Sequence, residues 1–323
     1  MDKIPIIMDV DTGVDDAMAI MLALSSKKLD VLGITTVAGN QTLDKTTRNT
    51  LQILELTGRT EIPVAAGADH PLFVPLRTAG NIHGESGLGN VSLPQPVKKT
   101  EPTDAAGLQR KLIEASPRPV VLVPTGPLTN IAILLKSCPH LKSRIEKIVL
   151  MGGGAYRGNA TPSAEFNVYT DPEAARIVFD AGIPIVMCGL DVTMQAVIYD
   201  SEFSKFEALG NREGDFCSKA FQFYSRSYKR VGSLRKGCAV HDAVTIMYLI
   251  HPEIMEGKDA KVEVDIDGGG TYGCTVTDLR PENASEQKNA FVLLKINRER
   301  FLDTLLSSIG SYAQPTAECR QGG

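Results

Sequence analysis

The chain has 323 residues, of which 43% are hydrophobic and 22% are charged, and its formal net charge at pH 7 is −4. This length is enough for one large α/β domain or two smaller ones, and the weakly acidic balance gives no electrostatic reason to expect nucleic acid or an anionic membrane as a partner. No segment approaches the roughly eighteen apolar residues that a membrane span requires, and there is no secretory context, so we expect a cytoplasmic protein. The six cysteines are scattered, without a C-x-x-C pair, and we expect them to be reduced.

Short β-branched runs alternate with amphipathic stretches over the first two thirds of the chain. This alternation is typical of βαβ units and predicts an α/β fold with an open, mainly parallel twisted sheet flanked by helices. The predicted strands are Ile4–Val10, Val31–Val37, Ile62–Ala65, Val120–Val123, Ile148–Met151 and Ile185–Cys188. The predicted helices between them are Asp16–Leu24, Leu43–Thr57, Asp104–Ala115, Leu128–Lys136 and Pro172–Ala181.

The last third of the chain changes character at Ser201, where the pattern becomes helical. It predicts a long helix near Asp215–Tyr228, another that opens at His241, and a last one at Arg298–Ile309. Further strands are expected at Lys261–Ile266, Thr275–Leu279 and Phe291–Ile296, with a glycine turn at Gly268–Gly270. Since no linker or repeat interrupts the pattern, we expect a single domain over residues 1–311 and a flexible tail over residues 312–323.

Glycine or polar residues follow five of the first six predicted strands. Ligands of open α/β sheets bind at the carboxyl ends of the strands. Glycine-rich turns are also ordinary connections between strands and helices, so it is the five together that predict an active site at this edge. The segments are Asp9–Asp16, Ala38–Asn40, Pro124–Asn130, Met151–Gly154 and Gly189–Thr193.

Four aspartates lie within eight residues at the end of the first predicted strand: Asp9, Asp11, Asp15 and Asp16. Carboxylates this close repel one another unless a cation neutralises them. The nearby ligands are all oxygens, which favours Ca²⁺ or Mg²⁺ over zinc, although the spacing is not that of an EF-hand. In the alternative interpretation, Asp15 and Asp16 only complement the dipole of the next helix, which leaves the other two unexplained.

The connection Gly152–Asn167 is long for a βα loop, and long loops in compact domains are often functional. Its Asn159, Glu165 and Asn167 offer hydrogen-bonding groups with only one basic residue, Arg157, which suits hydroxyl groups better than phosphate. The following Asp171-Pro172-Glu173 is typical of a helix start, and we interpret its two acids as capping residues.

Two histidines are candidates for chemistry. His241 stands at a predicted helix start beside Asp242, whose carboxylate could complete an oxygen-rich metal site and leave His241 as a proton donor. His83 lies in a loop bracketed by glycines that could close over a ligand. A lone histidine is more often structural than catalytic, and we expect the other three to lie at the surface: His70, His140 and His251.

Seven segments together resemble the inosine–uridine preferring nucleoside hydrolase family, in order from Ile4 to about Ile309. The resemblance implies a Ca²⁺-dependent N-ribohydrolase with an open α/β fold that assembles as a homodimer or homotetramer. One departure is Thr12, where the family commonly has proline. The segments that carry the resemblance are Asp9–Asp16, Val37–Thr42, His83–Gly87, Pro124–Asn130, Met151–Gly154, Ala164–Asn167 and Val240–Asp242.

The resemblance also implies roles for individual residues. The Ca²⁺ ligands would be Asp11, Asp16, Asp242 and the backbone carbonyl of Thr125, with Asp11 as the base that takes the proton of the attacking water. His241 would help the base to depart. The remaining predicted contacts to a ribonucleoside come from Asp15, Asn40, His83, Met151, Asn159, Glu165, Asn167 and Tyr228.

Two other functions compete with this one. Phosphohydrolases of the haloacid dehalogenase type also begin with an apolar strand that ends in Asp-x-Asp, but their threonine comes one position later than Thr12, and we find no downstream lysine and acidic pair to complete their site. A non-enzymatic nucleoside- or sugar-binding protein could use the same crevice, although it would not need His241 or four aspartates. The sequence does not decide which base is preferred.

Overall fold

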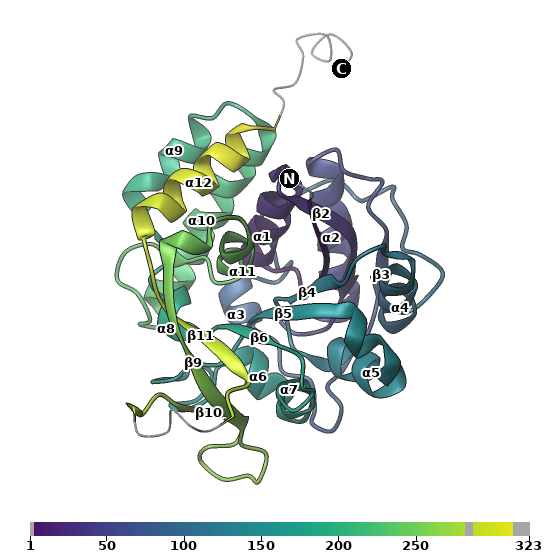
Figure 1. Cartoon of the computed structure of the whole chain (residues 1–323). Helices are drawn as coiled ribbons and strands as arrows, with labels where there is room; N and C mark the ends of the chain where they lie inside the picture. Colours follow the sequence, from purple (N-terminus) through teal and green to yellow (C-terminus); the bar gives the residue numbers. More distant parts are fainter. Residues whose placement is uncertain (1–2, 282–286, 313–323) are drawn as a thin grey trace.

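The computed structural model describes residues 3–281 and 287–312, and its centre is a large twisted sheet (Figure 1). Within the described residues the sheet has nine strands in the order β10-β9-β11-β6-β5-β4-β1-β2-β3. The strands from β11 to β3 pair in parallel, and β9 and β10 extend the edge in antiparallel fashion. Their bounds are β1 Ile4–Val10, β2 Leu29–Thr36, β3 Val64–Ala66, β4 Val120–Pro124, β5 Ile145–Met151, β6 Ile185–Cys188, β9 Met255–Val264, β10 Thr275–Asp278 and β11 Ala290–Ile296.

Helices cover both faces of this sheet, as the alternating pattern predicts (Figure 1). Side chains of one strand alternate between two hydrophobic cores: Ile6 and Met8 belong to one, and Ile7 belongs to the other. The first core includes side chains of α1 Val14–Ser25, α2 Leu43–Leu56, α10 Arg212–Arg230, α11 Ala243–Ile250 and α12 Arg298–Gly310. The second includes side chains of α4 Ala105–Ala115, α5 Thr129–Ser137 and α7 Pro172–Phe179.

Helix α1 is the most deeply placed of these helices. Each of its residues except the last is buried, and it packs against α11 and α12 on the side away from the sheet. Its start therefore lies at the inner end of the crevice rather than at the surface. Because β1 and β4 are neighbours in the sheet, the turns that follow them come together at the same edge.

Several short elements were not predicted from the sequence, since four or five residues carry too little periodicity to identify them. They lie mainly in the long connections that surround the carboxyl edge of the sheet. These elements are α3 Gly80–His83, α6 Phe166–Thr170, α8 Leu190–Thr193, α9 Phe203–Glu207, β7 Val197–Ile198, β8 Cys238–Ala239 and the 3-10 turns Pro139–Arg144, Asp200–Glu202 and Pro252–Ile254.

Boundaries are the main corrections to the predicted elements. Strand β9 begins six residues before the predicted Lys261, because its first half exposes residues such as Glu256, Lys258 and Asp259 and so lacks an apolar pattern. Helix α10 begins at Arg212, where Asn211 caps it by accepting a hydrogen bond from the backbone N–H of Gly214.

Cysteines and helix hydropathy can be followed in the part of the chain that the structure describes. Four cysteines are buried free thiols and Cys274 is a half-buried one. Among the described residues, no helix combines the length and the apolar character needed to cross a membrane. Tyr312, the first residue of the predicted tail, donates its hydroxyl to the carbonyl oxygen of Met21, and residues 313–323 lie outside the described part.

Candidate active site

A cavity of about 470 Å³ opens at the carboxyl edge of the sheet, where the sequence predicts the site. This volume lies within the range of typical small-molecule sites. The cavity brings together segments that extend along the chain from Asp15 to Asp242. Of the predicted site residues, its lining includes Asp15, Asn40, His83, Thr125, Met151, Asn159, Glu165, Asn167, Tyr228, His241 and Asp242.

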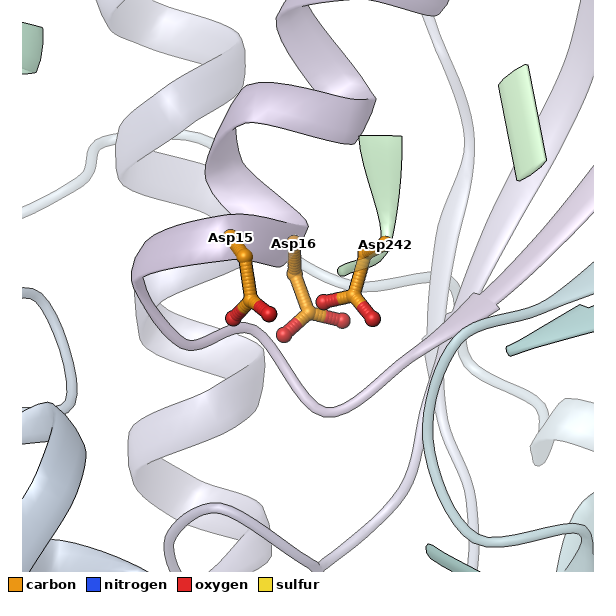
Figure 2. A group of neighbouring side chains, drawn as sticks. All are labelled: Asp15, Asp16 and Asp242. Atoms are coloured by element: carbon orange, nitrogen blue, oxygen red, sulfur yellow. The ribbon is translucent and has the colours of Figure 1, made fainter. Parts of the chain in front are cut away.

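Three carboxylates meet at the inner end of the cavity, and together with the adjoining Asp11 we call them the acidic floor. Figure 2 shows Asp15 and Asp16 at the start of α1 and Asp242 at the start of α11. Each contributes an oxygen atom, and these atoms all lie within 4.8 Å of one another. The two helices thus bring together acids that are more than 220 residues apart in the sequence.

Asp16 is held in place by the backbone around it. One of its carboxylate oxygens accepts a hydrogen bond from Gly13 N–H at 2.8 Å, which caps α1, and the other accepts one from the Thr125 hydroxyl at 2.7 Å. Asp16 therefore does cap the start of α1, as the alternative interpretation predicts. That interpretation does not explain Asp15, which has a buried carboxylate oxygen without a hydrogen-bond partner.

Asp11 lies beside the three carboxylates in a narrow niche. Its Oδ2 accepts a hydrogen bond from the backbone N–H of Asn40 at 2.6 Å, whereas its Oδ1 is buried and has no partner. Two glycines border the niche: a Cβ added to Gly126 would lie 2.9 Å from the carboxylate carbon of Asp11, and one added to Gly39 would collide with its Oδ2. Only residues without a side chain fit here.

Burial and repulsion by neighbouring charges raise the pKa of three of these carboxyl groups. Burial, followed by the charge of Asp16, raises the pKa of Asp15 to about 7 and that of Asp11 well above its usual range. Burial, followed by the charges of Asp15 and Asp16, raises the pKa of Asp242 well above its usual range. Among the described residues no lysine or arginine pairs with these acids, and the nearest basic group is His83 Nδ1, 3.8 Å from Asp15 Oδ1.

The donor set of the floor fits a hard cation. It consists of oxygen atoms only, and it includes two buried oxygens, Asp11 Oδ1 and Asp15 Oδ1, that no protein group satisfies. Buried polar atoms in proteins nearly always have a partner, so two orphans in one cluster indicate a missing ligand. Removal of the repulsion by a cation would also return the pKa values toward those of ordinary carboxylates.

Asp9 is close in sequence but points elsewhere. Its Oδ1 accepts hydrogen bonds from the Thr35 hydroxyl and from Asn130 Nδ2 at 2.5 and 2.8 Å, and burial raises its pKa to about 7. It is not among the residues that line the cavity. It connects β1 to β2 and α5 behind the site.

One side of the cavity is built from the long loop after β5. Asn167 donates from Nδ2 to the carbonyl oxygens of Thr125 and Met151, at 2.7 and 3.2 Å, and so connects the turns after β4 and β5. Glu165 caps α6 by accepting hydrogen bonds from the backbone N–H groups of Asn167 and Val168. Burial raises the pKa of Glu165.

The two amides at the other predicted contact positions also have defined partners. Asn40 donates from Nδ2 to Asp16 Oδ2 at 3.1 Å, so it is oriented by the acidic floor. Asn159 Oδ1 accepts from the backbone N–H of Phe166 at 2.9 Å and belongs to a more exposed part of the loop. Backbone hydrogen bonds from Ala155 and Tyr156 to the carboxylate of Asp191 tether the loop to α8.

Opposite the loop lies a wall of aromatic rings, which we call the aromatic wall: His83, Tyr224, Tyr228 and His241. The ring of Tyr224 lies 5.1 Å from that of His83 and 5.0 Å from that of Tyr228. His83 Nδ1 accepts a hydrogen bond from Val14 N–H at 3.2 Å. The histidine is the last residue of the short helix α3 and packs against the start of α1, where the sequence predicts a loop that could close over a ligand.

His241 has a partner on each side of its ring. Its Nε2 lies 2.5 Å from the hydroxyl of Tyr228, and its Nδ1 lies 2.7 Å from the hydroxyl of Thr193. Burial, with a smaller effect of Arg157, lowers its pKa to about 4, so the ring is neutral at pH 7. His241 thus lies in the cavity lining, as a neutral ring that is hydrogen-bonded to the hydroxyls of Tyr228 and Thr193.

Sequence reasoning missed several residues of the site. Thr193 lies in a segment already noted for following a strand, but nothing in the pattern indicated its contact with His241. Arg77 and Tyr169 also line the cavity, with the guanidinium 4.5 Å from the ring centre, and no sequence signal pointed to either. Conversely, His70 and His140 are exposed and His251 is half-buried outside the cavity, as expected.

Comparison with known proteins identifies the family to which the chain is similar. Residues 6–303 match the family model of the inosine-uridine preferring nucleoside hydrolases. The chain is 47% identical over 310 residues to the pyrimidine-specific ribonucleoside hydrolase RihA of Shewanella woodyi, covering 96% of this chain and 99% of that protein. It is 44% identical to RihA of Escherichia coli over the same shares of the two chains.

Solved structures agree with the sequence comparison. The purine-preferring ribonucleoside hydrolase of Gardnerella vaginalis superposes with a TM-score of 0.89 at 33% identity, covering 95% of this chain and 98% of that one. A plant nucleoside hydrolase gives a TM-score of 0.90 at 29% identity, with 96% and 100% covered. These matches exclude the dehalogenase-type alternative, and the chain belongs to the inosine-uridine preferring nucleoside hydrolase family of enzymes, which hydrolyse N-glycosidic bonds of ribonucleosides.

Proposed function

We propose that this enzyme hydrolyses pyrimidine ribonucleosides to ribose and free base with the help of a Ca²⁺ ion at the acidic floor. The observation that carries the proposal is that one site combines buried carboxylates with unpaired oxygens and a neutral histidine–tyrosine pair in the cavity wall. The first suits a cation and the activation of water, and the second suits a departing heterocycle.

The residues that would hold the ion are Asp11, Asp16, Asp242 and the backbone carbonyl of Thr125. A bound Ca²⁺ would lower the pKa of the attacking water and neutralise the repulsion among the acids. Ca²⁺ is proposed over Mg²⁺ because the family resemblance implies it, and the oxygen-only donor set suits either ion. Asp15 stands next to these ligands, and its unpaired Oδ1 is available to a sugar hydroxyl.

Asp11 is the proposed general base. Its Oδ1 is buried, has no protein partner and belongs to a carboxylate that Asn40 N–H and the two glycines hold in one position. The water's proton would pass to this oxygen as the water oxygen bonds to the anomeric carbon, while the electron pair of the C–N bond leaves with the base. The sugar passes through an oxocarbenium-like state, as in other glycoside hydrolyses.

The ribose would be bound by the polar side of the cavity. The Asn40 side chain is positioned by the Asp16 carboxylate, and Glu165 and Asn167 are positioned by backbone groups, so all three need little reorganisation to accept the sugar. Asn159 and Met151 lie along the same side. Such a site rejects sugars that lack a hydroxyl, because buried polar groups would be left unpaired.

The base would lie against the aromatic wall. As the C–N bond breaks, negative charge develops on the heterocycle, and a donor in the wall stabilises it. Tyr228 and His241 provide that donor pair, with His83 and Tyr224 beside them. The support for pyrimidines is the identity of 44 to 47% to proteins named pyrimidine-specific, against 33% to one named purine-preferring.

Base release from uridine, cytidine, inosine and adenosine by the purified protein tests this proposal. We expect kcat/KM for uridine and cytidine to exceed that for the two purine nucleosides by about tenfold or more, the discrimination that pocket shape alone can give. Equal or faster hydrolysis of inosine would contradict the pyrimidine preference. Absence of hydrolysis for all four would contradict the function itself.

Assembly and location stay predictions. The homodimer or homotetramer and the cytoplasmic location rest on the family resemblance and on composition. Analytical ultracentrifugation of the purified chain would decide the first, and a monomer at micromolar concentration would contradict it.

A further inference from the structure

Thr193 is buried at the end of α8 and has one side-chain partner within the described residues. Its hydroxyl lies 2.7 Å from His241 Nδ1, and its backbone N–H donates to the carbonyl oxygen of Gly189. The residue is 0% exposed and does not line the cavity. It therefore touches the site only through the histidine.

Two assignments of the protons are possible for the hydrogen bond between Thr193 and His241. A neutral imidazole carries its proton on either Nδ1 or Nε2, and the hydroxyl of threonine can donate or accept. If Nδ1 carried the proton, Thr193 would accept it, and the threonine's own buried O–H would have no acceptor. If Thr193 donates to Nδ1, each donor and acceptor in the contact is used, and the ring proton must be on Nε2.

The choice at Thr193 decides what Tyr228 can do. A proton on Nε2 points at the Tyr228 oxygen, 2.5 Å away, so the phenol accepts from the ring and its own proton is left for another acceptor, either the neighbouring Tyr224 hydroxyl or a group in the cavity. With the other tautomer, Nε2 would be an acceptor and would draw the phenol proton to itself. The tyrosine could then not donate to a departing base.

We infer that Thr193 is a positioning residue that holds His241 in the Nε2–H tautomer and thereby keeps the hydroxyl proton of Tyr228 available to a departing base. Thr193 donates to His241 and His241 donates to Tyr228, and no proton is transferred between these three residues. The catalytic meaning of the inference rests on the proposed function, since a donor in the wall matters when a base departs with developing negative charge.

The tautomer can be measured without any assay of activity. We propose ¹⁵N NMR of histidine-labelled protein at pH 7.5, where the two ring nitrogens of a neutral imidazole give separate shifts. The chain has five histidines. Comparison with the spectrum of His241→Asn assigns the His241 resonances, because they are absent from that variant. The wild type should show the Nε2–H form at His241.

Two substitutions at Thr193 separate the effect of its hydroxyl from that of its methyl group. Thr193→Val keeps the shape and removes the donor, and it should move the His241 signals toward the Nδ1–H form. Thr193→Ser keeps the donor and should keep the wild-type tautomer. Thr47→Val is the matched control, because it removes another buried threonine hydroxyl, bonded to Thr36 at 2.7 Å, far from the aromatic wall in sequence.

Kinetics then separate positioning from a merely structural role. Thr193→Val should lower kcat for uridine about tenfold or more, within the usual range of a lost proton-donating group, and lower that for p-nitrophenyl riboside far less, because nitrophenolate leaves without a donor. Thr193→Ser should restore turnover of uridine. Thr47→Val should change neither substrate's kcat selectively.

Each outcome decides the inference. An Nδ1–H form in the wild type, or an unchanged tautomer in Thr193→Val, overturns it, and so does an equal loss of turnover on both substrates. If the wild type hydrolyses no nucleoside, the proposed function fails, but the wild-type and Thr193→Ser spectra still test the tautomer. If Thr193→Val does not fold, the same two spectra serve.

Discussion

The acidic floor and the aromatic wall face the same cavity but satisfy their polar atoms in different ways. In the floor, Asp11 and Asp15 each keep a buried oxygen without a partner, and the pKa values of both are raised by burial and repulsion. In the wall, both ring nitrogens of His241 have partners, and the ring is neutral at pH 7. The floor is therefore incomplete without a ligand, whereas the wall is complete on its own.

This difference suggests a division of work. A cluster that is unsatisfied by protein groups gains most from a cation, so ion binding and water activation belong to the floor. A wall whose side chains are already hydrogen-bonded is pre-organised to stabilise the negative charge that develops on the base as the C–N bond breaks. Substitutions in the two regions should consequently differ both in size and in which substrates they affect.

The largest effect is expected for Asp11→Ala, which removes a proposed ligand and the proposed base together. Turnover should fall by about 10²–10⁴-fold from the loss of the base alone, for every substrate, and calorimetric titration should show weakened Ca²⁺ binding. Asp9→Asn is the control, since Asp9 lies behind the site, and its effect on turnover should be much milder. Turnover in Asp11→Ala close to that of the wild type would contradict the assignment of the floor.

The next effect concerns the sugar. Uridine should exceed 2′-deoxyuridine in kcat/KM by on the order of 10³ or more, because loss of a hydroxyl leaves buried polar groups such as Asp15 unpaired. Parallel measurements on cytidine and deoxycytidine control for the base. Comparable rates with and without the hydroxyl would show that the floor does not contact the ribose.

A smaller and selective effect is expected in the aromatic wall. His241→Ala should lower turnover of uridine by about 10²-fold relative to that of p-nitrophenyl riboside, whose leaving group is stable without a proton. His83→Ala is a useful comparison within the same wall, since His83 binds the start of α1 and not Tyr228. If both substrates lose equally in His241→Ala, the histidine only positions the ribose or the start of α11.

The smallest effect on turnover, but a clear one on stability, is expected for Asp9→Asn. The pKa of Asp9 is raised from 3.8 to about 7 in the folded protein, so folding favours its protonated form. That contribution is complete below pH 3.8 and is lost as the pH rises through 7, with a slope of about 1.4 kcal/mol per pH unit between these values.

Urea unfolding of the metal-free protein between pH 4 and 8 measures this contribution. The difference in unfolding free energy between the wild type and Asp9→Asn should change with that slope in favour of the variant as the pH rises. A pH-independent difference would show that Asp9 is ionised in the folded protein. Asp44→Asn, at an exposed position on α2, controls for the loss of a charge.

The fold was largely predictable because buried parallel strands and amphipathic helices leave strong periodic patterns. The edge strand β9 was misplaced for the opposite reason, since its exposed half carries charged residues such as Glu256 and Lys258. The acidic floor could be predicted in part because Asp11, Asp15 and Asp16 are neighbours in the sequence, and repulsion among carboxylates is visible without a structure.

The aromatic wall was harder to predict, because its contacts join three separate segments. His241 and Tyr228 were identified as candidates, but the hydrogen bond between them and the contact with Thr193 depend on how α8, α10 and α11 meet. The neutral state of His241 likewise follows from burial, which no local pattern reports. Sequence reasoning therefore found the residues of the wall and not their relationship.

The glycine niche around Asp11 has a consequence for how this enzyme can diversify. A side chain at Gly39 or Gly126 would displace the carboxylate, so these two positions tolerate almost no exploration by mutation. Met194 and Tyr224, which line the cavity away from the niche, carry no such restriction from the backbone. Laboratory evolution toward a new base preference should therefore vary cavity positions such as Met194 and keep both glycines, Tyr228 and His241 fixed, so that each library member retains the residues of the chemical step.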